Sequence, residues 1–321
     1  MLPPFRLGIT RDFLKADGSL GFGDIGLQTL AENPRLEYEF LPECGAEIPA
    51  AVADAYDALL VLAPRVTAAT LEACRRLTLV ARFGVGYDNV DVPACTRNNV
   101  LLTITPSGVR RPVAVSALAL LLALSHKLLA KDRLTRSGRW LEKLDHMGIG
   151  LMGRTLGLIG LGNIGREIVR VTAPLEMRTV AFDPFVSAEV ARSEGVELLS
   201  LEDLLRQADF VCVCCTLTPQ TRHLLNAERL SLLKPTSYLI NVARGPIVDQ
   251  AALTRALQER RIAGAALDVF EQEPIAADDP LLTLDNVIVS PHAICWTDEL
   301  FRGNGEVACR SILEVAAGRV P

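Results

Sequence analysis

Several features that would indicate a nucleic-acid or membrane partner are missing from this sequence. Its 321 residues carry a formal net charge of −5, so no basic excess is available to neutralise phosphates. The most apolar stretch, residues 113–125, is shorter than the ~20 residues that cross a bilayer. Residues 1–10 do not have the pattern of a secretory signal. We therefore expect a cytoplasmic protein with no nucleic-acid partner and no membrane partner.

The eight cysteines lack the spacings of a metal site or of a disulfide framework. Cys212 and Cys215 have CxxC spacing, but no second CxxC and no pair of histidines at ligand spacing accompanies them. Cys212, Cys214 and Cys215 fall inside an apolar, strand-like segment. We expect reduced structural thiols and no metal.

Length and composition predict a two-domain α/β protein. Apolar residues make up 50% of the chain and charged residues 22%, which is typical of a soluble globular protein. The chain is longer than the ~250 residues at which a single core stops growing. No repeat or low-complexity segment is visible.

Short apolar runs alternate with helical patterns, which predicts parallel sheets. A long helix is expected over residues 113–137, ended by Gly138, and a last helix over 298–318 that returns to the first domain. Expected strands of the first domain are 7–10, 59–62, 80–83 and 100–104. Those of the second are 155–160, 178–183, 210–215, 238–241, 264–269 and 287–290, the number in a doubly wound nucleotide-binding sheet.

A glycine-rich turn directly follows the apolar strand at 155–160. Gly160, Gly162 and Gly165 form a GxGxxG pattern that opens an amphipathic helix. In this context the first glycine permits a tight turn, the second lets the backbone approach a pyrophosphate, and the third allows close helix packing. With Asn163 and Ile164, they form the expected dinucleotide-binding loop.

Asp183 ends the second strand of this domain and predicts which dinucleotide binds. Its carboxylate can accept hydrogen bonds from the adenosine ribose hydroxyls and would repel a 2′-phosphate. Pro184 and Phe185 follow, so nothing nearby favours that phosphate. NAD is therefore preferred over NADP.

Three motifs stand out in the last third of the chain. They are Asn241-Val-Ala-Arg244-Gly-Pro-Ile-Val-Asp249, Ala266-Leu-Asp268-Val-Phe-Glu271-Gln-Glu273-Pro274 and Val289-Ser-Pro291-His292. With Arg82-Phe-Gly84-Val-Gly86-Tyr-Asp88-Asn89-Val-Asp91 in the first domain, they make the sequence resemble the D-isomer-specific 2-hydroxyacid dehydrogenases. The resemblance covers essentially the whole chain.

The resemblance implies an α/β fold of two Rossmann-like domains with parallel sheets. The substrate domain would be discontinuous and flavodoxin-like, made of residues 1–104 and 292–321, with an NAD-binding domain over 105–291. The implied reaction is NAD-dependent interconversion of a D-2-hydroxy acid and its 2-oxo acid.

The expected catalytic residues are Arg244, Glu273 and His292, and their chemistry suits this reaction. A guanidinium forms a planar, bidentate pair with a carboxylate, so Arg244 would bind the substrate carboxylate and carbonyl. An imidazole is a proton donor that works near neutral pH, and a neighbouring Glu273 carboxylate would favour the charged His292 ring.

Further roles are implied by the same resemblance. The substrate carboxylate would bind a loop whose glycines expose backbone N–H groups, and Asp268 would receive the nicotinamide carboxamide. Position alone, four residues after His292 on the segment that returns to the first domain, predicts that Trp296 borders the substrate side chain; the alternative is that it fills the domain interface. The remaining histidines, His126, His146 and His223, lack such partners in the sequence and are expected to be structural. The carboxylate loop is Phe83, Gly84, Val85 and Gly86, and the other cofactor-side residues are Thr216, Pro219 and Ala243.

Two segments depart from the commoner family pattern and leave the substrate open. Arg110 and Arg111 stand at the expected domain junction, and Ala293-Ile-Cys295-Trp296 follows the histidine. Arg136, Arg139 and Trp140 resemble an arm of family dimers, so a homodimer through the NAD domain is expected. The alternatives are a dinucleotide-sensing, corepressor-like binding protein, and formate or phosphite oxidation on the same scaffold.

Overall fold

Residues 3–321 are described by a computed structural model, and the chain divides into two compact units. The first consists of Met1–Pro112 and Trp296–Pro321, and the second is Val113–Cys295. The sequence predicts the junctions after residues 104 and 291. The units change eight and four residues later, and the helix α5 (Pro106–Ser125) runs through the first junction.

The first unit contains a five-stranded parallel sheet in the order β2-β1-β3-β4-β5, which is the flavodoxin-like order. β3 is buried along its whole length, as a central parallel strand should be. The strands are β1 (Phe5–Ile9), β2 (Leu36–Phe40), β3 (Ala58–Val61), β4 (Leu79–Arg82) and β5 (Leu101–Thr103). The helices are η1 (Arg11–Phe13), α1 (Leu27–Ala31), α2 (Ala50–Ala53), α3 (Ala68–Glu72), α4 (Val92–Arg97) and α12 (Asp298–Ala316).

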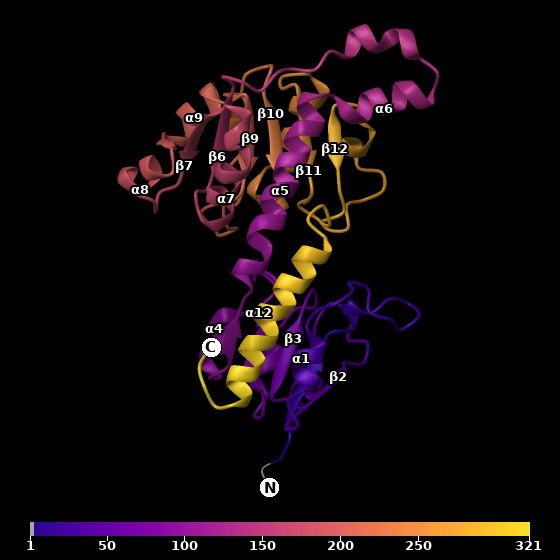
Figure 1. Cartoon of the computed structure of the whole chain (residues 1–321), viewed down its shortest axis with the longest axis vertical. Coiled ribbons are helices and arrows are strands. Elements are labelled where there is room, and N and C mark those ends of the chain that lie inside the picture. The colour runs from indigo at the N-terminus through magenta and orange to yellow at the C-terminus, as the bar shows by residue number, and fades with distance from the viewer. Residues whose placement is uncertain (1–2) are drawn as a thin grey trace. The chain divides into compact units, whose positions relative to one another are not determined.

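The C-terminal helix α12 packs within this first unit, beside α1 and β4 (Figure 1). Small residues allow the approach: a Cβ on Gly305 would lie 2.3 Å from the Ile25 carbonyl oxygen. Asn304 is buried, and its Oδ1 accepts a 2.8 Å hydrogen bond from the Thr105 hydroxyl.

The second unit contains a seven-stranded parallel sheet in the order β12-β11-β10-β9-β6-β7-β8. Six of these strands have the doubly wound order, with β12 added at one edge. The strands are β6 (Thr155–Ile159), β7 (Arg178–Phe182), β8 (Glu197–Leu198), β9 (Phe210–Val213), β10 (Tyr238–Asn241), β11 (Gly264–Leu267) and β12 (Val287–Val289). The helices are α6 (Leu128–Arg136), η2 (Trp140–His146), α7 (Asn163–Thr172), η3 (Ala173–Leu175), α8 (Ala188–Ser193), α9 (Leu201–Gln207), α10 (Ala227–Leu230), η4 (Gly245–Ile247), α11 (Gln250–Gln258) and η5 (Pro280–Thr283).

Apolar clusters cover both faces of this second sheet. Along β9, Phe210 and Cys212 belong to one cluster, whereas Val211 and Val213 belong to the other. Successive strand residues point to opposite faces, and because both faces are buried the strand is apolar throughout. Cys212 is therefore a core residue.

Two strands and one helix break were not predicted. β2 is an edge strand that buries Leu36 but exposes Glu37, Tyr38 and Glu39, so its apolar signal is weak, and β8 has only two residues. The prediction of a single helix over 113–137 is wrong. The helical segment begins at Pro106 and is interrupted at Lys127, whose φ of 50° is left-handed. Ile149 N–H donates to the Ser125 carbonyl at that point, in place of the next helical turn.

Helix α5 is the one helix among residues 3–321 with the length and apolarity to cross a membrane. More than half of its most apolar window is buried inside the protein. Ala117, Leu120, Leu121 and Leu124 contribute to a core cluster of the second unit, so α5 is a core helix.

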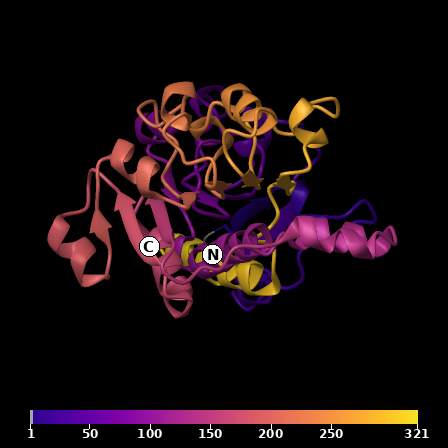
Figure 2. The same ribbon diagram turned by 90° about the horizontal axis from the view of Figure 1, so that it is seen from above.

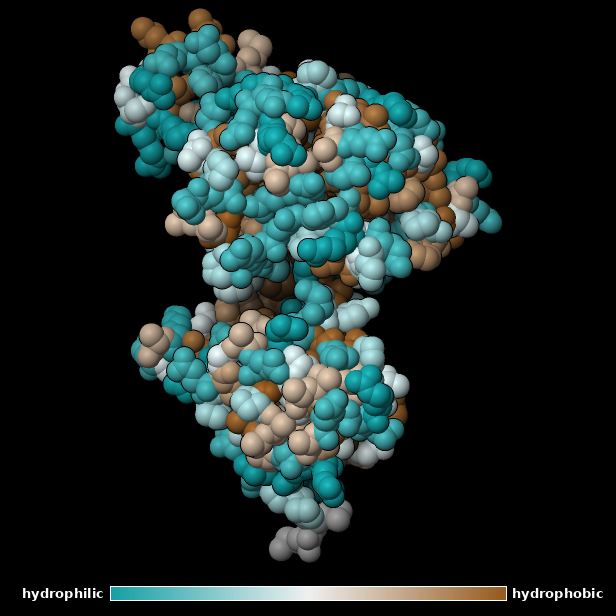
Figure 3. All heavy atoms as spheres, turned by 180° about the vertical axis from the view of Figure 1, so that it is seen from behind, coloured by the Kyte–Doolittle hydropathy of each residue, from teal (hydrophilic) through white to brown (hydrophobic). Residues whose placement is uncertain are grey.

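The segment that contains α6 and η2 extends beyond the sheet of the second unit (Figures 1 and 2). Hydrophobic atoms gather on it in the space-filling view, at the upper left (Figure 3). Its exposed large apolar residues are Leu128, Leu129, Trp140, Leu141, Leu144, Met147 and Met152.

Candidate functional site

The glycine-rich turn between β6 and α7 has the geometry that a dinucleotide pyrophosphate needs. Gly160 has a φ of 103°, and a Cβ there would lie 2.9 Å from the Cys215 backbone. A Cβ on Gly165 would lie 2.4 Å from the Gly160 carbonyl oxygen, so helix and strand are in close contact. A Cβ on Gly162 would meet nothing within 4 Å. The open space therefore lies at the one glycine where a phosphate approaches.

Asn163 and Ile164 begin helix α7, with Gly162 as the N-cap. The first N–H groups of a helix lack partners within the helix and favour anions. Arg166, which the sequence analysis did not single out, donates from Nε to the Leu161 carbonyl oxygen at 3.2 Å. A guanidinium therefore lies beside the glycine-rich turn.

Asp183 lies directly after β7 and is fixed by two backbone hydrogen bonds. Its Oδ2 accepts from Leu161 N–H at 2.8 Å, and its Oδ1 from Phe185 N–H at 2.9 Å. The carboxylate is thus tied to the glycine-rich turn. Its remaining lone pairs suit the ribose hydroxyls expected of it.

Two thiols lie against the same turn. Cys214 Sγ donates to the Gly160 carbonyl oxygen at 3.0 Å. A hydrogen bond with Cys212, together with burial, raises the pKa of the Cys214 thiol, and burial raises the pKa of Cys215 to about 11. Both are neutral packing groups at neutral pH. All eight cysteines are free thiols.

Arg244 follows β10 at a point where two segments touch. A Cβ on Gly245 would lie 1.8 Å from the carbonyl carbon of Phe270, so only glycine allows this contact. Asn241 braces the turn, since its Nδ2 donates to the Arg244 carbonyl oxygen and its Oδ1 accepts from Ala243 N–H, both at 3.0 Å. The strand end that carries Arg244 is therefore in direct contact with the loop that carries Glu273.

Glu273 and His292 form the hydrogen-bonded pair expected from the sequence. His292 Nδ1 lies 2.7 Å from Glu273 Oε2, and Glu273 Oε1 accepts from Phe270 N–H at 2.9 Å. Within residues 3–321 no other group hydrogen-bonds the His292 ring. The opposite ring nitrogen, Nε2, remains for a substrate.

The charge state of Glu273 follows from its surroundings. Burial raises the pKa of Glu273, but hydrogen bonds from His292 and Phe270 N–H and the charges of His292 and Arg244 outweigh it. The net pKa is lower than usual, so the carboxylate is ionised at neutral pH. An ionised carboxylate can only accept, so Nδ1 of His292 donates to it and the orientation of the ring is fixed.

Asp268 is buried and holds the segment after His292. Its Oδ1 accepts from the N–H groups of Ala293 and Ile294, both at 3.0 Å. Burial raises the pKa of Asp268, against the lowering effect of these bonds and of a hydrogen bond with Ser290. The structure thus shows an anchor for the histidine loop, whereas the nicotinamide role stays a prediction.

The prediction that His223 has no partner is wrong. Its Nε2 lies 2.5 Å from Glu271 Oε1. The two residues are far apart in sequence, so no local pattern reveals the pair. Residues Thr216 to Pro219 form a turn nearby along the chain, closed by a 2.7 Å hydrogen bond from the Thr221 hydroxyl to the Thr216 carbonyl oxygen.

In the first unit, Phe83 to Gly86 form a loop directly after β4. Gly84 has a φ of 140°, and its N–H donates to the Arg82 carbonyl oxygen at 3.0 Å. The N–H groups of Val85 and Gly86 donate to no other group among residues 3–321. The Arg82 guanidinium lies beside Gly84, 2.6 Å from where a Cβ would be. The open donors are thus those of Val85 and Gly86, next to a cation that the sequence analysis did not assign.

Trp296 belongs to an aromatic cluster in the first unit. Its ring centroid lies 4.9 Å from that of Phe22 and 5.7 Å from that of Phe301, both edge to face. Phe301 stacks near Phe83 at 6.2 Å, and Phe83 meets Phe13 edge to face at 5.0 Å. Trp296 is 48% exposed, whereas Phe13, Phe83 and Phe301 are buried. Trp296 is therefore the exposed edge of a cluster that includes the first residue of the 83–86 loop.

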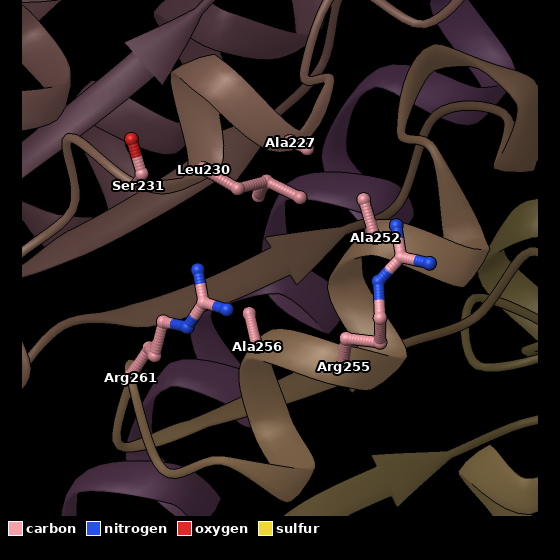
Figure 4. Close-up of a pocket in the computed structure, with 7 residues that line it drawn as sticks. All are labelled: Ala227, Leu230, Ser231, Ala252, Arg255, Ala256 and Arg261. Carbon is pink, nitrogen blue, oxygen red and sulfur yellow. The ribbon is translucent and has the colours of Figure 1, made fainter.

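Other hollows and polar clusters do not coincide with these residues. A hollow of about 210 Å³ between α10 and α11 is lined by Leu230, Ser231, Arg255 and Arg261, with three alanines (Figure 4). A hollow of about 470 Å³ lies beside α6 and β12. Neither contains a residue predicted for the site. Within residues 3–321, no group of three or more His, Cys, Asp or Glu side chains is arranged to hold a metal ion.

Comparison with known proteins gives consistent relatives. The family profile described as "D-isomer specific 2-hydroxyacid dehydrogenase, NAD binding domain" matches residues 118–293. A glyoxylate reductase of Thermococcus onnurineus is 38% identical over 304 residues, covering 92% of this chain and 91% of that relative. A D-3-phosphoglycerate dehydrogenase of Methanocaldococcus jannaschii is 38% identical over 257 residues, covering 80% of this chain but 49% of the longer relative.

A solved structure with the same fold contains a dinucleotide. It is the D-lactate dehydrogenase of Aquifex aeolicus, complexed with NAD and lactic acid. The TM-score is 0.85 at 26% identity, with 97% of this chain and 96% of that chain covered.

Proposed function

The chain belongs to the D-isomer-specific 2-hydroxyacid dehydrogenases, NAD-dependent enzymes, and on that premise we propose that Arg244, Glu273 and His292 interconvert a D-2-hydroxy acid and its 2-oxo acid. The observation that carries this proposal is the 2.7 Å contact between His292 Nδ1 and an ionised Glu273. In the proposed division of labour, the first unit binds substrate and the second binds NAD.

In the reducing direction, the three residues have different tasks. Arg244 binds the substrate carboxylate and polarises the carbonyl, because a guanidinium is a permanent, planar cation. The N–H groups of Val85 and Gly86 give the carboxylate further donors. NADH, when bound, supplies the hydride. His292 then transfers its Nε2 proton to the carbonyl oxygen as negative charge develops there, and Glu273 stabilises the imidazolium before that transfer.

The residues around the glycine-rich turn support NAD as cofactor. Gly162 leaves space for the pyrophosphate, and Asn163 and Ile164 begin the helix whose N–H groups face it. Asp183 would accept from the adenosine ribose. Thr216, Pro219, Ala243 and Asp268 are proposed to line the nicotinamide side.

We extend the proposal to the substrate side chain. Trp296 is four residues from His292, and an extended chain spans at most ~3.6 Å per residue, so their Cα atoms are within ~14 Å. Its cluster also includes Phe83 of the carboxylate loop. An apolar or aryl substrate side chain would pack on the exposed indole.

Substitution of Trp296 tests this extension. Trp296→Ala should lower kcat/KM more for a 2-oxo acid with an aryl side chain than for glyoxylate. The difference should correspond to ~1–3 kcal/mol of transition-state free energy. Tyr38→Ala removes another exposed ring of the same unit that is outside the cluster, and should change neither. An equal loss across all substrates would assign Trp296 to packing.

A homodimer is the proposed assembly, through the segment of α6 and η2. Leu141 is 85% exposed and Leu144 is 77% exposed, and contiguous exposed apolar residues indicate a protein interface. A second copy of the chain would cover them. Sedimentation should show a dimer that Leu141→Asp with Leu144→Asp dissociates, and a monomeric wild type would contradict this. A cytoplasmic location completes the proposal.

A substrate panel separates the proposed function from its two rivals. The wild type should oxidise NADH with glyoxylate, pyruvate, hydroxypyruvate or phenylpyruvate. A corepressor-like protein would bind NADH without turnover. A formate or phosphite dehydrogenase would reduce NAD with formate or phosphite as the hydride donor and would leave every 2-oxo acid unchanged.

A further inference from the structure

A second histidine–carboxylate pair includes a residue of the loop that carries Glu273. His223 Nε2 and Glu271 Oε1 are 2.5 Å apart, and Glu271 is two residues before Glu273. The side chains of His223 and Glu271 are 42% and 33% exposed. The pair joins the segment after β9 to the loop after β11.

The backbone around His223 also contacts the segment that carries Arg244. His223 N–H donates to the Pro246 carbonyl oxygen at 2.8 Å. Leu225 N–H donates to Ile247, and Asp249 N–H returns a bond to Leu225. His223 is therefore fixed next to the turn that begins at Arg244. Its backbone is in the left-handed conformation, with a φ of 49°.

Glu271 is held from its other side by Gln250. Glu271 N–H donates to Gln250 Oε1 at 3.0 Å, and Gln250 N–H lies 3.4 Å from Glu271 Oε1. Gln250 in turn donates to Asp279 at 2.8 Å. The carboxylate thus lies between His223 and the start of α11, and its backbone is one residue from Phe270, whose N–H binds Glu273.

We propose that His223 is a positioning residue for the acid–base pair. Its imidazole holds Glu271, which fixes the loop from which Glu273 reaches His292. The inference rests on the proposed function of Glu273 and His292, and His223 itself does not touch the reacting atoms.

The size of the expected effects distinguishes positioning from stabilisation. A partly exposed ion pair contributes only ~0–1 kcal/mol to stability. A misplacement of ~1 Å can lower a reaction rate ~10²-fold. Loss of the pair should therefore lower kcat measurably, while the free energy of unfolding falls by no more than ~1 kcal/mol.

Three variants test the pair, with one matched control. His223→Asn keeps a residue type that tolerates positive φ but is too short to reach Glu271. Glu271→Ala removes the acceptor, whereas Glu271→Gln retains an acceptor for the His223 ring. His126→Asn makes the same chemical change at another exposed histidine of the second unit.

The kinetic readout is NADH-dependent reduction of the best 2-oxo acid. His223→Asn and Glu271→Ala should each lower kcat ~10-fold, which is less than the ~10²-fold loss that a ~1 Å misplacement can cause. They should move the alkaline limb of the profile to lower pH and leave KM for NADH unchanged. The double variant should be no worse than either single one, since coupled partners are not additive. Glu271→Gln and His126→Asn should behave as wild type.

A spectroscopic readout needs no turnover. The chain has four histidines, so the proton resonance of the His292 Nδ1–H···Glu273 bond can be assigned by substitution. It should broaden or shift in His223→Asn and stay in place in His126→Asn. The inference would be overturned if His223→Asn kept both the wild-type resonance and the wild-type kcat. It would also be overturned if the losses of kcat in the two single variants added in the double variant, or if each loss of kcat only followed the loss in unfolding free energy. A wild type without turnover would overturn the proposed function, and the resonance would still decide the positioning.

Discussion

Gly245→Ala should move Arg244 away from Glu273 and His292 without altering any charged side chain. In the wild type, a Cβ at this position would lie 1.8 Å from the Phe270 carbonyl carbon, 1.9 Å from its oxygen and 2.4 Å from Glu271 N. These neighbours are backbone atoms, which cannot rotate away as a side chain can.

The size of the movement follows from ordinary contact distances. Ordinary Cβ contacts begin at 3.4 Å, so the two segments must move apart by ~1.5 Å to accept a methyl group without compression. Arg244 is on one segment and Glu273 on the other. Because a ~1 Å misplacement can cost ~10² in rate, kcat should fall by ~10² or more. Overpacking should lower the free energy of unfolding by only ~1–3 kcal/mol.

The assay combines kinetics, cofactor binding and unfolding. NADH binding should persist, because the glycine-rich turn is a separate element of the same unit. Gly150→Ala is the control, since a Cβ there meets nothing within 4 Å, and it should keep wild-type kcat. A Gly245→Ala enzyme with wild-type kcat and stability would refute the argument that this contact positions the site.

The remaining predictions concern the cofactor, the acid–base pair and stability in acid. Asp183→Ala should narrow the preference for NADH over NADPH in kcat/KM and raise KM for NADH, because Leu161 N–H loses its acceptor; a wild type that prefers NADPH would contradict this. Glu273→Gln should move the alkaline limb of 2-oxo acid reduction to lower pH, since the imidazolium loses an ionised partner; an unshifted pH–rate profile would separate the two residues. Asp209 accepts from Thr155 N–H and Lys234 at 2.9 and 3.0 Å, and although burial alone would raise the pKa of Asp209, these bonds keep it below its usual value. A depressed folded-state pKa contributes stability that is present above the unfolded pKa and lost as the pH falls. Asp209→Asn should therefore lower the free energy of unfolding by ~1–3 kcal/mol near neutral pH, and by less in acid, as denaturant titrations would show.

The fold class followed from periodicity because the central strands of both sheets are buried on both faces and are largely apolar. β6 and β9 are such strands. β2 escaped because an edge strand with Glu37 and Glu39 exposed has little apolar signal. The break at Lys127 escaped because it depends on Ile149, a residue distant in sequence, which takes the Ser125 carbonyl.

The contact between Glu273 and His292 was predictable because both residues occur in recognisable motifs. His223 was assigned no partner because Glu271 approaches it only through the fold. The same holds for the anchoring of the histidine loop by Asp268 and for the contact of Gly245 with Phe270. Motifs thus identify residues with chemical roles, whereas the contacts that position them are tertiary.

The most direct test of the central claim is His292→Ala, measured by NADH oxidation with the best 2-oxo acid and by NADH binding. Removal of a general acid costs ~10²–10⁴ in rate, so kcat should fall by at least ~10² while the dissociation constant of NADH changes little. His126→Ala, at an exposed histidine, should retain wild-type kcat. If His292→Ala turns over at the wild-type rate, the proton comes from another group and the account of this site is wrong.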